Sequence, residues 1–293
     1  MKIAIDVSQI VYGTGVSRYQ AQLVEALLKI DHRNEYIVFG SSLRLRHKLN
    51  SFKKDLSKYS NIKFKFYPIP LSVLEFIWNK LHILPIDKLT GPVDIFHSSD
   101  WIQPPISRDS TKKITTIHDM VVYLFPSSIH KRILTNQKRR LMRIKQDIDL
   151  IIADSNATKE DVIKFLQIPE AKIKVVYLAS SADFRPQTDE TINTVLEKYK
   201  IKKPYIFSVA TQEPRKNIQK LLDVFEKISQ LSKYKYQNLQ LVLAGKYGWG
   251  DELKVRENVI WTDFINQEDL IVLYSGCRVF AYPSLYEGFG LPV

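Results

Sequence analysis

The stretch KIAIDVSQIVYGTGVSRYQAQLVEALLKI, residues 2–30, decides the fold of the chain. It opens with an apolar, β-branched run at 2–7, which predicts a buried strand. A turn containing Gly13 and Gly15 follows, and an amphipathic helical pattern then covers about 17–30. A strand, a glycine turn and a helix in this order are typical of the repeating unit of a parallel α/β sheet.

The same alternation continues along the chain in two series. The pattern predicts further strands in the first series at 36–40, 61–67, 94–99, 113–119, 149–155 and 172–178, and in the second at 205–210, 239–245, 259–264 and 279–284. Helical patterns lie between them at 71–83, 131–147, 156–167, 217–232 and 267–275. We therefore expect an α/β protein whose parallel sheets carry helices on both faces.

A polar, proline-bearing segment around 180–204 separates the two series. It predicts a Rossmann-like domain at 1–184, a linker at 185–203 and a second Rossmann-like domain at 204–293. Four strands are few for a doubly wound sheet, and the sequence stops after a turn where a helix should begin. We expect from this that the second domain is incomplete and the sequence truncated at its C-terminus.

Composition excludes several classes of protein. Hydrophobic residues make up 45% and charged residues 25%, which is ordinary for a globular chain and unlike a disordered one. A single cysteine, Cys277, excludes a disulfide framework. Asp6 interrupts the first apolar run, so no secretory signal is expected, and no run approaches the ~20 apolar residues of a membrane span. These features predict a cytoplasmic protein, soluble or peripheral on the inner face of the membrane.

The net charge of +12 is concentrated in the first half, where residues 1–185 hold 29 of the 43 Lys and Arg but 18 of the 31 Asp and Glu. Such an excess indicates an acidic partner: nucleic acid, anionic lipid or a phosphorylated acceptor. The basic residues gather in 44–65 and in 131–145.

The segment 131–145 contains no acidic residue and seven basic ones: Lys131, Arg132, Lys138, Arg139, Arg140, Arg143 and Lys145. Apolar residues, including Leu141 and Ile144, are interleaved with them. A basic amphipathic helix of this kind favours an anionic membrane surface over a base-reading element. A solvated basic face is the alternative. Residues 71–85, rich in leucine and aromatic residues, are expected to pack in the core or to line an acceptor groove, with the core favoured.

Two features of the first series follow strands, where open parallel sheets bind their ligands. The turn with Gly13 and Gly15 leads into a helix N-terminus, which attracts anions. His118, followed by Asp119, ends the strand at 113–119 and suits sugar-hydroxyl recognition or proton transfer. Read alone, the first is equally an ordinary turn, and a structural histidine is the more frequent reading of the second.

Two features of the second series also follow strands. Arg215 and Lys216 precede a helix, where cations oppose the helix dipole, and a bound diphosphate would account for them. A solvated surface pair is the alternative. Glu287 precedes a glycine-rich turn that leaves the backbone amides of Phe289, Gly290 and Leu291 available to a ligand. The sequence has no serine nucleophile elbow, no paired-cysteine metal site and no phosphate loop of the G-x-x-x-x-G-K type.

Taken together, the segments GTGVSRY, TTIHD, ADSNATKEDV, EPRKNIQKLLDVF, LVLAGKYG and PSLYEGFGLPV, in this order and spacing, resemble family 4 of the glycosyltransferases. The resemblance covers essentially the whole chain, and six motifs in sequence are specific where each alone is weak. Family members are retaining enzymes of the GT-B fold, with two facing Rossmann-like domains. The sequence is most similar to bacterial mannosyl- or glucosyltransferases that build polysaccharide and glycolipid.

The resemblance implies a role for each matching residue. The Gly13–Gly15 loop would approach the donor diphosphate, and His118 would contact the transferred sugar near its 6-hydroxyl. Arg215 and Lys216 would bind the diphosphate and stabilise the departing nucleotide. Glu287 would hold sugar hydroxyls, helped by the backbone of Phe289, Gly290 and Leu291. The family's second glutamate would stand at position 295, beyond the last residue given, so we expect this fragment to be inactive or badly impaired.

The expected reaction is transfer of a hexose, mannose or glucose, from a nucleotide-diphosphate sugar to a glycan or lipid-linked acceptor, with retention of configuration. We expect neither a metal nor a cofactor, since no Asp-x-Asp motif is present and the cations can stabilise the leaving group. An anionic membrane surface is a possible further partner. The alternatives are another GT-B enzyme, such as an epimerase or a pyridoxal-dependent phosphorylase, and a basic nucleic-acid-binding protein, which no nucleic-acid motif supports.

Overall fold

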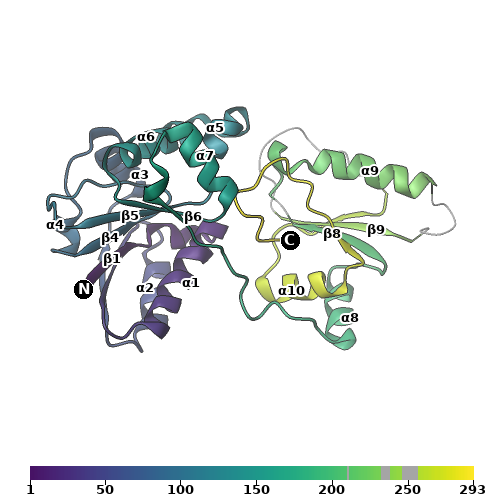
Figure 1. Ribbon diagram of the computed structural model, residues 1–293. Coiled ribbons are helices and arrows are strands. Elements are labelled where there is room, and N and C mark those ends of the chain that lie inside the picture. Colours follow the sequence, from purple (N-terminus) through teal and green to yellow (C-terminus); the bar gives the residue numbers. More distant parts are fainter. Residues whose placement is uncertain (210, 232–237, 246–256) are drawn as a thin grey trace. The chain divides into compact units, whose positions relative to one another are not determined.

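The computed structural model describes residues 1–209, 211–231, 238–245 and 257–293. The chain forms two compact units, Met1–Tyr177 and Leu178–Val293. Each unit is built on a parallel sheet with helices on both of its faces, as predicted (Figure 1).

The sheet of the first unit has seven parallel strands in the order β3-β2-β1-β4-β5-β6-β7. Their bounds are β1 Lys2–Asp6, β2 Glu35–Ser41, β3 Ile62–Tyr67, β4 Ile95–Ser98, β5 Lys112–Ile117, β6 Leu150–Ala153 and β7 Ile173–Val175. The chain first adds strands on one side of β1 and then returns to add β4 on the other side. The order therefore reverses between β1 and β4, and a crevice at the carboxyl ends of these strands is where such sheets bind ligands.

Two of the longer helices of the first unit begin at residues whose side chains cap them. Thr14 caps α1 (Gly15–Ile30) and exchanges hydrogen bonds with Ser17, and Ser155 caps α7 (Asn156–Leu166) by accepting from the amide of Thr158. The other helices are α2 Arg46–Leu56, α3 Leu71–Leu74, the π-helical turn η2 Glu75–Leu81, α4 Asp87–Thr90, α5 Val121–Leu124 and α6 Lys131–Asp147. Short 3-10 turns lie at η1 Ser8–Tyr12, η3 Pro126–Ser128 and η4 Glu170–Lys172.

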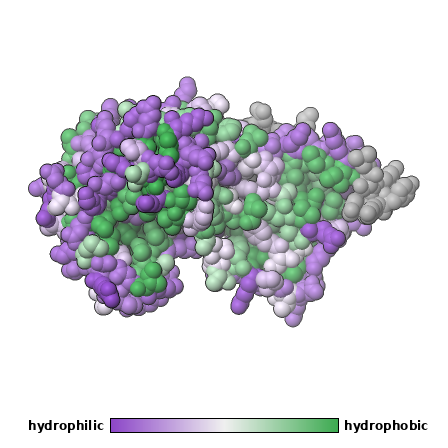
Figure 2. Space-filling view, in the orientation of Figure 1, coloured by the Kyte–Doolittle hydropathy of each residue, from purple (hydrophilic) through white to green (hydrophobic). Residues whose placement is uncertain are grey.

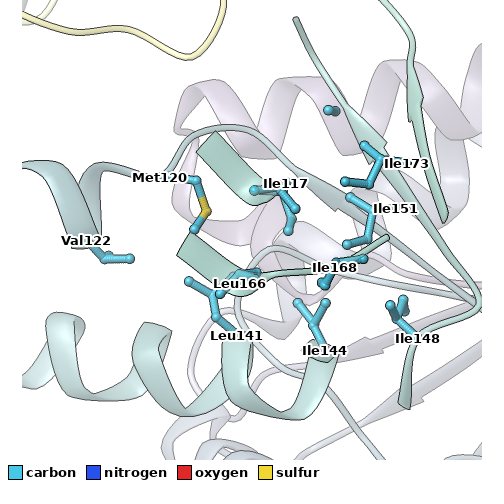
Figure 3. Close-up of a cluster of buried hydrophobic side chains, with 12 residues drawn as sticks. Ile117, Met120, Val122, Leu141, Ile144, Ile148, Ile151, Leu166, Ile168 and Ile173 are labelled. Carbon is cyan, nitrogen blue, oxygen red and sulfur yellow. The ribbon is translucent and has the colours of Figure 1, made fainter. Parts of the chain in front are cut away.

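The apolar side of α6 packs inside the first unit. Leu141 and Ile144 are buried against Ile117 and Ile151 of the sheet, as Figure 3 shows. The expectation that these two residues add apolar burial at a membrane is wrong. The amphipathic pattern of 131–145 is explained by a helix that covers a sheet, because such a helix needs one apolar stripe for the core.

Residues 71–85 divide between core and surface. Leu74 and Trp78 are fully buried, and the indole Nε1 of Trp78 donates to the carbonyl of Leu84 at 2.9 Å. Phe76 and Ile83, in contrast, are exposed. The favoured core packing is thus correct for one face of this segment, while the other face leaves apolar side chains in solvent.

The second unit repeats the strand order of the first with four parallel strands, β10-β9-β8-β11. Their bounds are β8 Tyr205–Val209, β9 Gln240–Ala244, β10 Val259–Trp261 and β11 Val279–Phe280. The helices are α8 Asp189–Lys198, α9 Ile218–Leu231 and α10 Gln267–Gly276, with a 3-10 turn, η5, at Pro214–Lys216. The order reverses between β8 and β11. The end of the LVLAGKYG segment, residues 246–248, lies outside the described residues.

Helix α8 lies within 185–203, the range that the sequence analysis treated as a linker. Thr188 caps the helix, and its residues Ile192, Val195 and Leu196 are buried in the same cluster as Tyr205 and Leu273. The segment looks polar because most of its helix faces solvent. Only packing against α10 and the sheet shows that it belongs to the second unit.

Candidate active site

Two loops of the second unit meet at the point where the strand order reverses. One follows β8 and contains η5, and the other follows β11 and contains residues 281–291. The amide of Leu285 donates to the carbonyl of Arg215 at 2.9 Å, and Asn217 Nδ2 donates to the carbonyl of Pro283 at 3.1 Å. These bonds tie the loops together across some seventy residues of sequence.

Arg215, Lys216 and Glu287 form a compact charge cluster between these loops. Glu287 Oε1 lies 2.6 Å from Lys216 Nζ, and Glu287 Oε2 lies 3.0 Å from Arg215 Nη1. Arg215 Nη2 contacts Glu213 Oε1 at 2.5 Å, and Lys216 Nζ donates to the hydroxyl of Tyr282 at 2.8 Å. Both cations are largely buried, so the solvated-pair alternative does not describe them.

The cluster keeps its carboxylate ionised. Burial by itself raises the pKa of Glu287, but the hydrogen bond from Lys216 and the charges of Lys216 and Arg215 outweigh it, and the pKa is lowered. Two cations and two carboxylates, those of Glu213 and Glu287, thus lie together at the carboxyl end of the sheet. A diphosphate entering this place would exchange these ion pairs for its own.

The turn after Glu287 contains a glycine in the left-handed region. Gly290 has φ +88, a conformation that side-chain-bearing residues rarely adopt, and no atom lies within 4 Å of the position that a Cβ would take. Phe289 and Leu291 are exposed, while Gly288 is buried.

The glycine turn of the first unit is also open. Gly13 has φ +68 and ends η1, and Gly15 is the first residue of α1. No atom lies within 4 Å of a Cβ built on either glycine. The amides at the start of a helix have no partner within it, and here the Thr14–Ser17 capping box satisfies those of residues 14 and 17.

His118 lies just beyond β5 and forms an ion pair with Asp154, which follows β6. The His118 Nδ1 to Asp154 Oδ2 distance is 2.5 Å, and both side chains are largely buried. Burial by itself lowers the pKa of His118, but the hydrogen bond to Asp154 and the charges of Asp100, Asp154 and Asp119 outweigh it, and the pKa is raised. This pairing favours the imidazolium, whose Nε2 can donate to an oxygen.

Neighbouring side chains continue this polar network. His97 Nε2 lies 2.9 Å from Thr116 Oγ1, which lies 3.1 Å from the hydroxyl of Tyr19. The ring of Tyr19 packs edge-on against His118, with centroids 4.7 Å apart. Burial, with the charges of His118 and Arg140, lowers the pKa of His97 to about 4, so this second histidine is neutral.

Asp154 was not among the residues predicted from the sequence, although a signal for it was present. Asp154 lies near the end of the strand predicted at 149–155, just as His118 does in its own strand. Since the carboxyl ends of neighbouring parallel strands share one edge, the rule that selected His118 also selects Asp154. Asp119 has a different role, because its Oδ1 accepts from the amide of Val121 at 3.0 Å and supports the turn into α5.

Arg140 was predicted to lie on a basic surface, and this is wrong. Its side chain is 1% exposed, and Nη1 binds Asp100 Oδ1 at 2.9 Å while Nη2 donates to Thr115 Oγ1 at 3.0 Å and to the carbonyl of Thr116 at 3.1 Å. Position 140 lies one turn before Ile144, and the two therefore share the inner side of α6.

Arg143 is half-buried, with bonds to the carbonyls of Asn79 and Lys80. The five remaining basic residues of this group are exposed: Lys131, Arg132, Lys138, Arg139 and Lys145.

Within the described ranges, no group of three or more His, Cys, Asp or Glu side chains is arranged to hold a metal ion.

Two family descriptions match the chain: "Glycosyltransferase Family 4" at residues 13–179 and "Glycosyl transferases group 1" at residues 191–293. The first covers more than half of the chain, and together they span both units. The chain belongs to glycosyltransferase family 4. It is a glycosyltransferase with the GT-B fold, as the resemblance of its motifs predicted.

Two bacterial relatives of this glycosyltransferase are named mannosyltransferases. O-antigen chain mannosyltransferase B of Escherichia coli is 27% identical over 314 residues, an alignment that covers 100% of this chain and 79% of the relative. The serotype-specific mannosyltransferase WbdA of Escherichia coli is 33% identical over 158 residues, which cover 49% of this chain and 19% of the relative.

A solved structure, Anabaena Alr3699/HepE in complex with UDP and glucose, resembles this glycosyltransferase with a TM-score of 0.61 and 16% identity. The match covers 99% of this chain and 76% of the other. At this identity the likeness shows the shared fold.

In each unit the predicted site residues lie on loops that follow the carboxyl ends of strands. In the second unit Arg215, Lys216 and Glu287 are in direct contact. In the first unit His118 and the glycine turn both follow strands at the carboxyl edge of the sheet.

Proposed function

We propose that this glycosyltransferase moves a hexose from a nucleotide-diphosphate sugar to a glycan or lipid-linked acceptor, with retention of configuration and without a metal. The observation that carries the proposal is the cluster of Arg215, Lys216 and Glu287 at the carboxyl ends of β8 and β11. It places two cations beside the start of α9, at the point where the strand order of the sheet reverses.

These groups suit the chemistry of a departing diphosphate. The leaving group gains negative charge as its bond to the sugar breaks, and cations already held in place stabilise that charge without reorganisation. Arg215 can form two parallel hydrogen bonds to phosphate oxygens, while Lys216 acts as a point charge. The free amides at the start of α9 add a favourable dipole. This arrangement supplies what a metal ion supplies in other transferases.

The donor sugar and the acceptor are proposed from the relatives. Two of them are named mannosyltransferases of O-antigen chain or serotype-specific synthesis, which supports mannose and a growing glycan. The likeness to a structure holding UDP and glucose supports a nucleotide-diphosphate donor. In the first unit, the His118–Asp154 pair supplies a charged donor suited to a hydroxyl of the transferred sugar.

A panel of nucleotide sugars in a thermal-shift assay tests the donor. We expect at least one nucleotide mannose or glucose to raise the melting temperature, and its nucleoside diphosphate to do the same. In a chain extended through the second glutamate expected at position 295, the anomeric coupling in the proton NMR spectrum of the product then reports retention, and turnover in EDTA reports metal independence. A panel with no stabilising member, or a product of inverted configuration, contradicts the proposal.

A second proposal concerns an anionic bilayer as the place of attachment. In the described parts of the chain, no helix is long and apolar enough to cross a membrane. Five exposed apolar residues lie on the segment from α3 to just beyond η2: Val73, Phe76, Leu81, Ile83 and Leu84. Figure 2 shows hydrophobic side chains among hydrophilic ones on the visible face of the molecule.

The basic residues of α6 adjoin this apolar segment. Arg143 ties α6 to η2 through the carbonyls of Asn79 and Lys80, and Arg132 pairs with Glu75 at 3.3 Å. We name Lys131, Lys138, Arg139 and Lys145 the α6 basic face; all four are exposed. A cationic surface beside exposed apolar side chains suits an anionic bilayer, where each basic residue contributes about 1 kcal/mol. In this proposal the apolar contribution to membrane binding comes from residues 73–84, and not from Leu141 and Ile144 on the inner side of α6.

A further inference from the structure

An open hollow of about 550 Å³ lies at the amino edge of the first unit's sheet, close to the point marked N in Figure 1. It forms where β1 and β2 begin and beside the loops that lead into β4 and β5. Its volume is in the usual range of small-molecule sites, and it lies at the opposite edge of the sheet from His118. Five charged residues line it: Lys2, Arg33, Glu35, Asp94 and Arg108.

The two carboxylates of the hollow are already engaged by neighbouring groups. Glu35 Oε1 pairs with Lys63 Nζ at 2.7 Å, and Asp94 Oδ2 accepts from the amide of Lys2 at 2.7 Å. The hydrogen bond from Lys63 and the charges of Lys63 and Lys2 hold the pKa of Glu35 below its usual value, against the effect of burial. These contacts leave the arginines of the hollow without a carboxylate partner.

Arg33 and Arg108 come from two separate loops and are both exposed. Within the described ranges of the chain, neither guanidinium forms an ion pair or a hydrogen bond. Like charges that line one hollow repel each other, and the concave wall concentrates their field. An anion bound between them would offset this repulsion and would form charge-assisted contacts with both.

Hydrogen bonds hold the backbone of both loops. Asp31 accepts from the amide of Arg33 at 2.9 Å and from the hydroxyl of Tyr36 at 2.7 Å. The amide of the buried Thr111 donates to the carbonyl of Arg108 at 3.1 Å, and its hydroxyl donates to the backbone just before β4 at 2.7 Å. Because the two loops are fixed in advance, binding a ligand between them costs less conformational entropy.

The chemistry of the hollow favours a phosphate group on a polar body. The planar fork of a guanidinium binds phosphate oxygens in pairs. None of the residues that line the hollow is aromatic, so a nucleobase would find no ring to stack on. Asp94 Oδ1 has no hydrogen-bond partner in the described part of the chain and can accept from a hydroxyl. A phosphorylated sugar supplies both the dianionic phosphate and the hydroxyls.

We propose that this hollow is a second ligand site of the first unit, in which Arg33 and Arg108 bind the phosphate group of a sugar phosphate and Asp94 accepts from one of its hydroxyls. The site goes beyond the proposed glycosyl transfer and does not depend on it. Since the hollow and His118 lie at opposite edges of one sheet, its ligand would not compete with a substrate at the carboxyl edge.

Calorimetry at low salt tests the site with four probes: glucose 6-phosphate, mannose 6-phosphate, inorganic phosphate and malonate. We expect at least one sugar phosphate to bind more tightly than inorganic phosphate or malonate, because neither of these has a hydroxyl for Asp94. Arg33→Gln and Arg108→Gln should each weaken that binding by about tenfold or more, as the loss of a charge-assisted contact does. Both residues are exposed, so the melting temperature should stay the same.

Asp94→Asn separates the sugar from its phosphate. It removes a negative charge from the hollow, so inorganic phosphate should bind as well as before or better. The advantage of the sugar phosphate over inorganic phosphate should shrink, because the carboxylate that accepts from a hydroxyl is gone.

Two further variants serve as controls. The double variant Arg44→Gln, Arg46→Gln removes two exposed arginines of the same unit that do not line the hollow, and it should leave the affinity for the sugar phosphate unchanged. Lys216→Ala removes a cation of the charge cluster in the second unit and should leave it unchanged as well.

The proposal is overturned if no sugar phosphate binds, if inorganic phosphate or malonate binds as tightly, or if Arg33→Gln and Arg108→Gln bind like the double variant. A loss of binding in Lys216→Ala alone would assign the sugar phosphate to the charge cluster, which also overturns the proposal. Affinity for a nucleoside diphosphate, measured on the same variants, reports on the proposed function. The two proposals therefore stand or fall separately.

Discussion

Arg215 and Lys216 are both paired with Glu287, so the local positive charge is already partly neutralised. A diphosphate must compete with this carboxylate for the same two cations. We therefore expect the affinity for the nucleoside diphosphate to fall when a cation is removed and to rise when the carboxylate is removed.

We expect Arg215→Ala and Lys216→Ala each to weaken binding of the nucleoside diphosphate by roughly ten- to hundredfold. The reason is that a charge-assisted contact to phosphate is worth about 1.5–3 kcal/mol. Isothermal titration calorimetry measures it, and circular dichroism shows whether each variant is folded. Unchanged affinity in both variants would remove the diphosphate role from this pair.

Glu287→Gln is expected to change the affinity for the nucleoside diphosphate in the opposite direction from the two cation variants. Without the carboxylate both cations turn to the phosphates, and we expect affinity for the nucleoside diphosphate to rise by about two- to tenfold while turnover falls. A variant that binds the diphosphate more weakly than the unaltered protein would show that Glu287 mainly orients the cations.

The His118–Asp154 pair makes a prediction about pH. Because the pKa of His118 is raised in the folded protein, its pairing with Asp154 stabilises the fold fully at pH values below about 6.5, the pKa of the unfolded state. This stabilisation is lost as the pH rises through the pKa of His118 in the folded state. In Asp154→Asn the burial of His118 is no longer offset, and we expect the pKa to fall below its usual range. The free energy of unfolding should then drop by about 1–3 kcal/mol at pH 5 and by less at pH 9.

Denaturant titrations at both pH values and the NMR titration of the His118 ring check this. Asp109→Asn controls for the loss of a surface carboxylate. An equal loss of stability at pH 5 and pH 9 would indicate that Asp154 acts through packing and not through the charge of the imidazole.

At the scale of elements, α6 serves two environments at once. Its inner side gives Leu141 and Ile144 to the core and Arg140 to the sheet, and its outer side carries the α6 basic face. Surface attachment can therefore be changed without disturbing the fold, provided that the variants are confined to the outer side.

We expect Lys131→Gln, Lys138→Gln and Arg139→Gln together to lower flotation with anionic vesicles by about tenfold or more, since three basic residues contribute about 3 kcal/mol in total. Phosphatidylserine-containing and neutral vesicles, each at low and high salt, measure it. The matched control changes Lys198, Lys202 and Lys203 of the second unit to Gln, which removes equal charge elsewhere. Equal loss in both triple variants would show attraction by net charge alone, and no flotation of the unaltered protein would end the membrane proposal.

At the scale of the whole molecule, each unit has its own sheet and its own buried clusters. Gly276 shows how tightly the second unit is packed around α8, α10 and β8. A Cβ at this position would lie 2.7 Å from Tyr205 Oη and 2.8 Å from Ile192 Cγ2. The hydroxyl of Tyr205 is fixed by its bond to the carbonyl of Leu273 at 2.8 Å and has no room to move.

We expect Gly276→Ala to destabilise the second unit by about 1–3 kcal/mol, the usual cost of overpacking a core. Differential scanning calorimetry should show an earlier transition for this unit, while the transition of the first unit stays in place. Gly91→Ala in the first unit is the comparison, because a Cβ there meets no atom within 4 Å but φ is +81. It should lower the other transition through backbone strain. A single transition that shifts equally in both variants would show that the units unfold together.

Much of this architecture could be predicted from the sequence because it is locally encoded. Most strands are apolar runs and most helices carry an apolar stripe. The spacing of the apolar residues and the length of each run therefore identify these elements without knowledge of what they pack against. The site loops could be predicted as well, since parallel strands place their carboxyl ends on one edge and the polar residues after β5, β8 and β11 are adjacent to those ends in the sequence.

Only the tertiary structure decided which side chains meet and which face inward. Glu287 reaches Arg215 because β11 pairs with β8, and Asp154 reaches His118 because β6 pairs with β5, neither of which a linear pattern specifies. Arg140 and its six basic neighbours in 131–145 look alike in sequence. It is buried because a partner, Asp100, lies on the strand edge beneath it, and a buried charge is tolerated only where such a partner is present. The sequence by itself determined the strands, most of the longer helices and the sheet edge that carries the polar loops, whereas strand pairing determined which side chains meet at that edge.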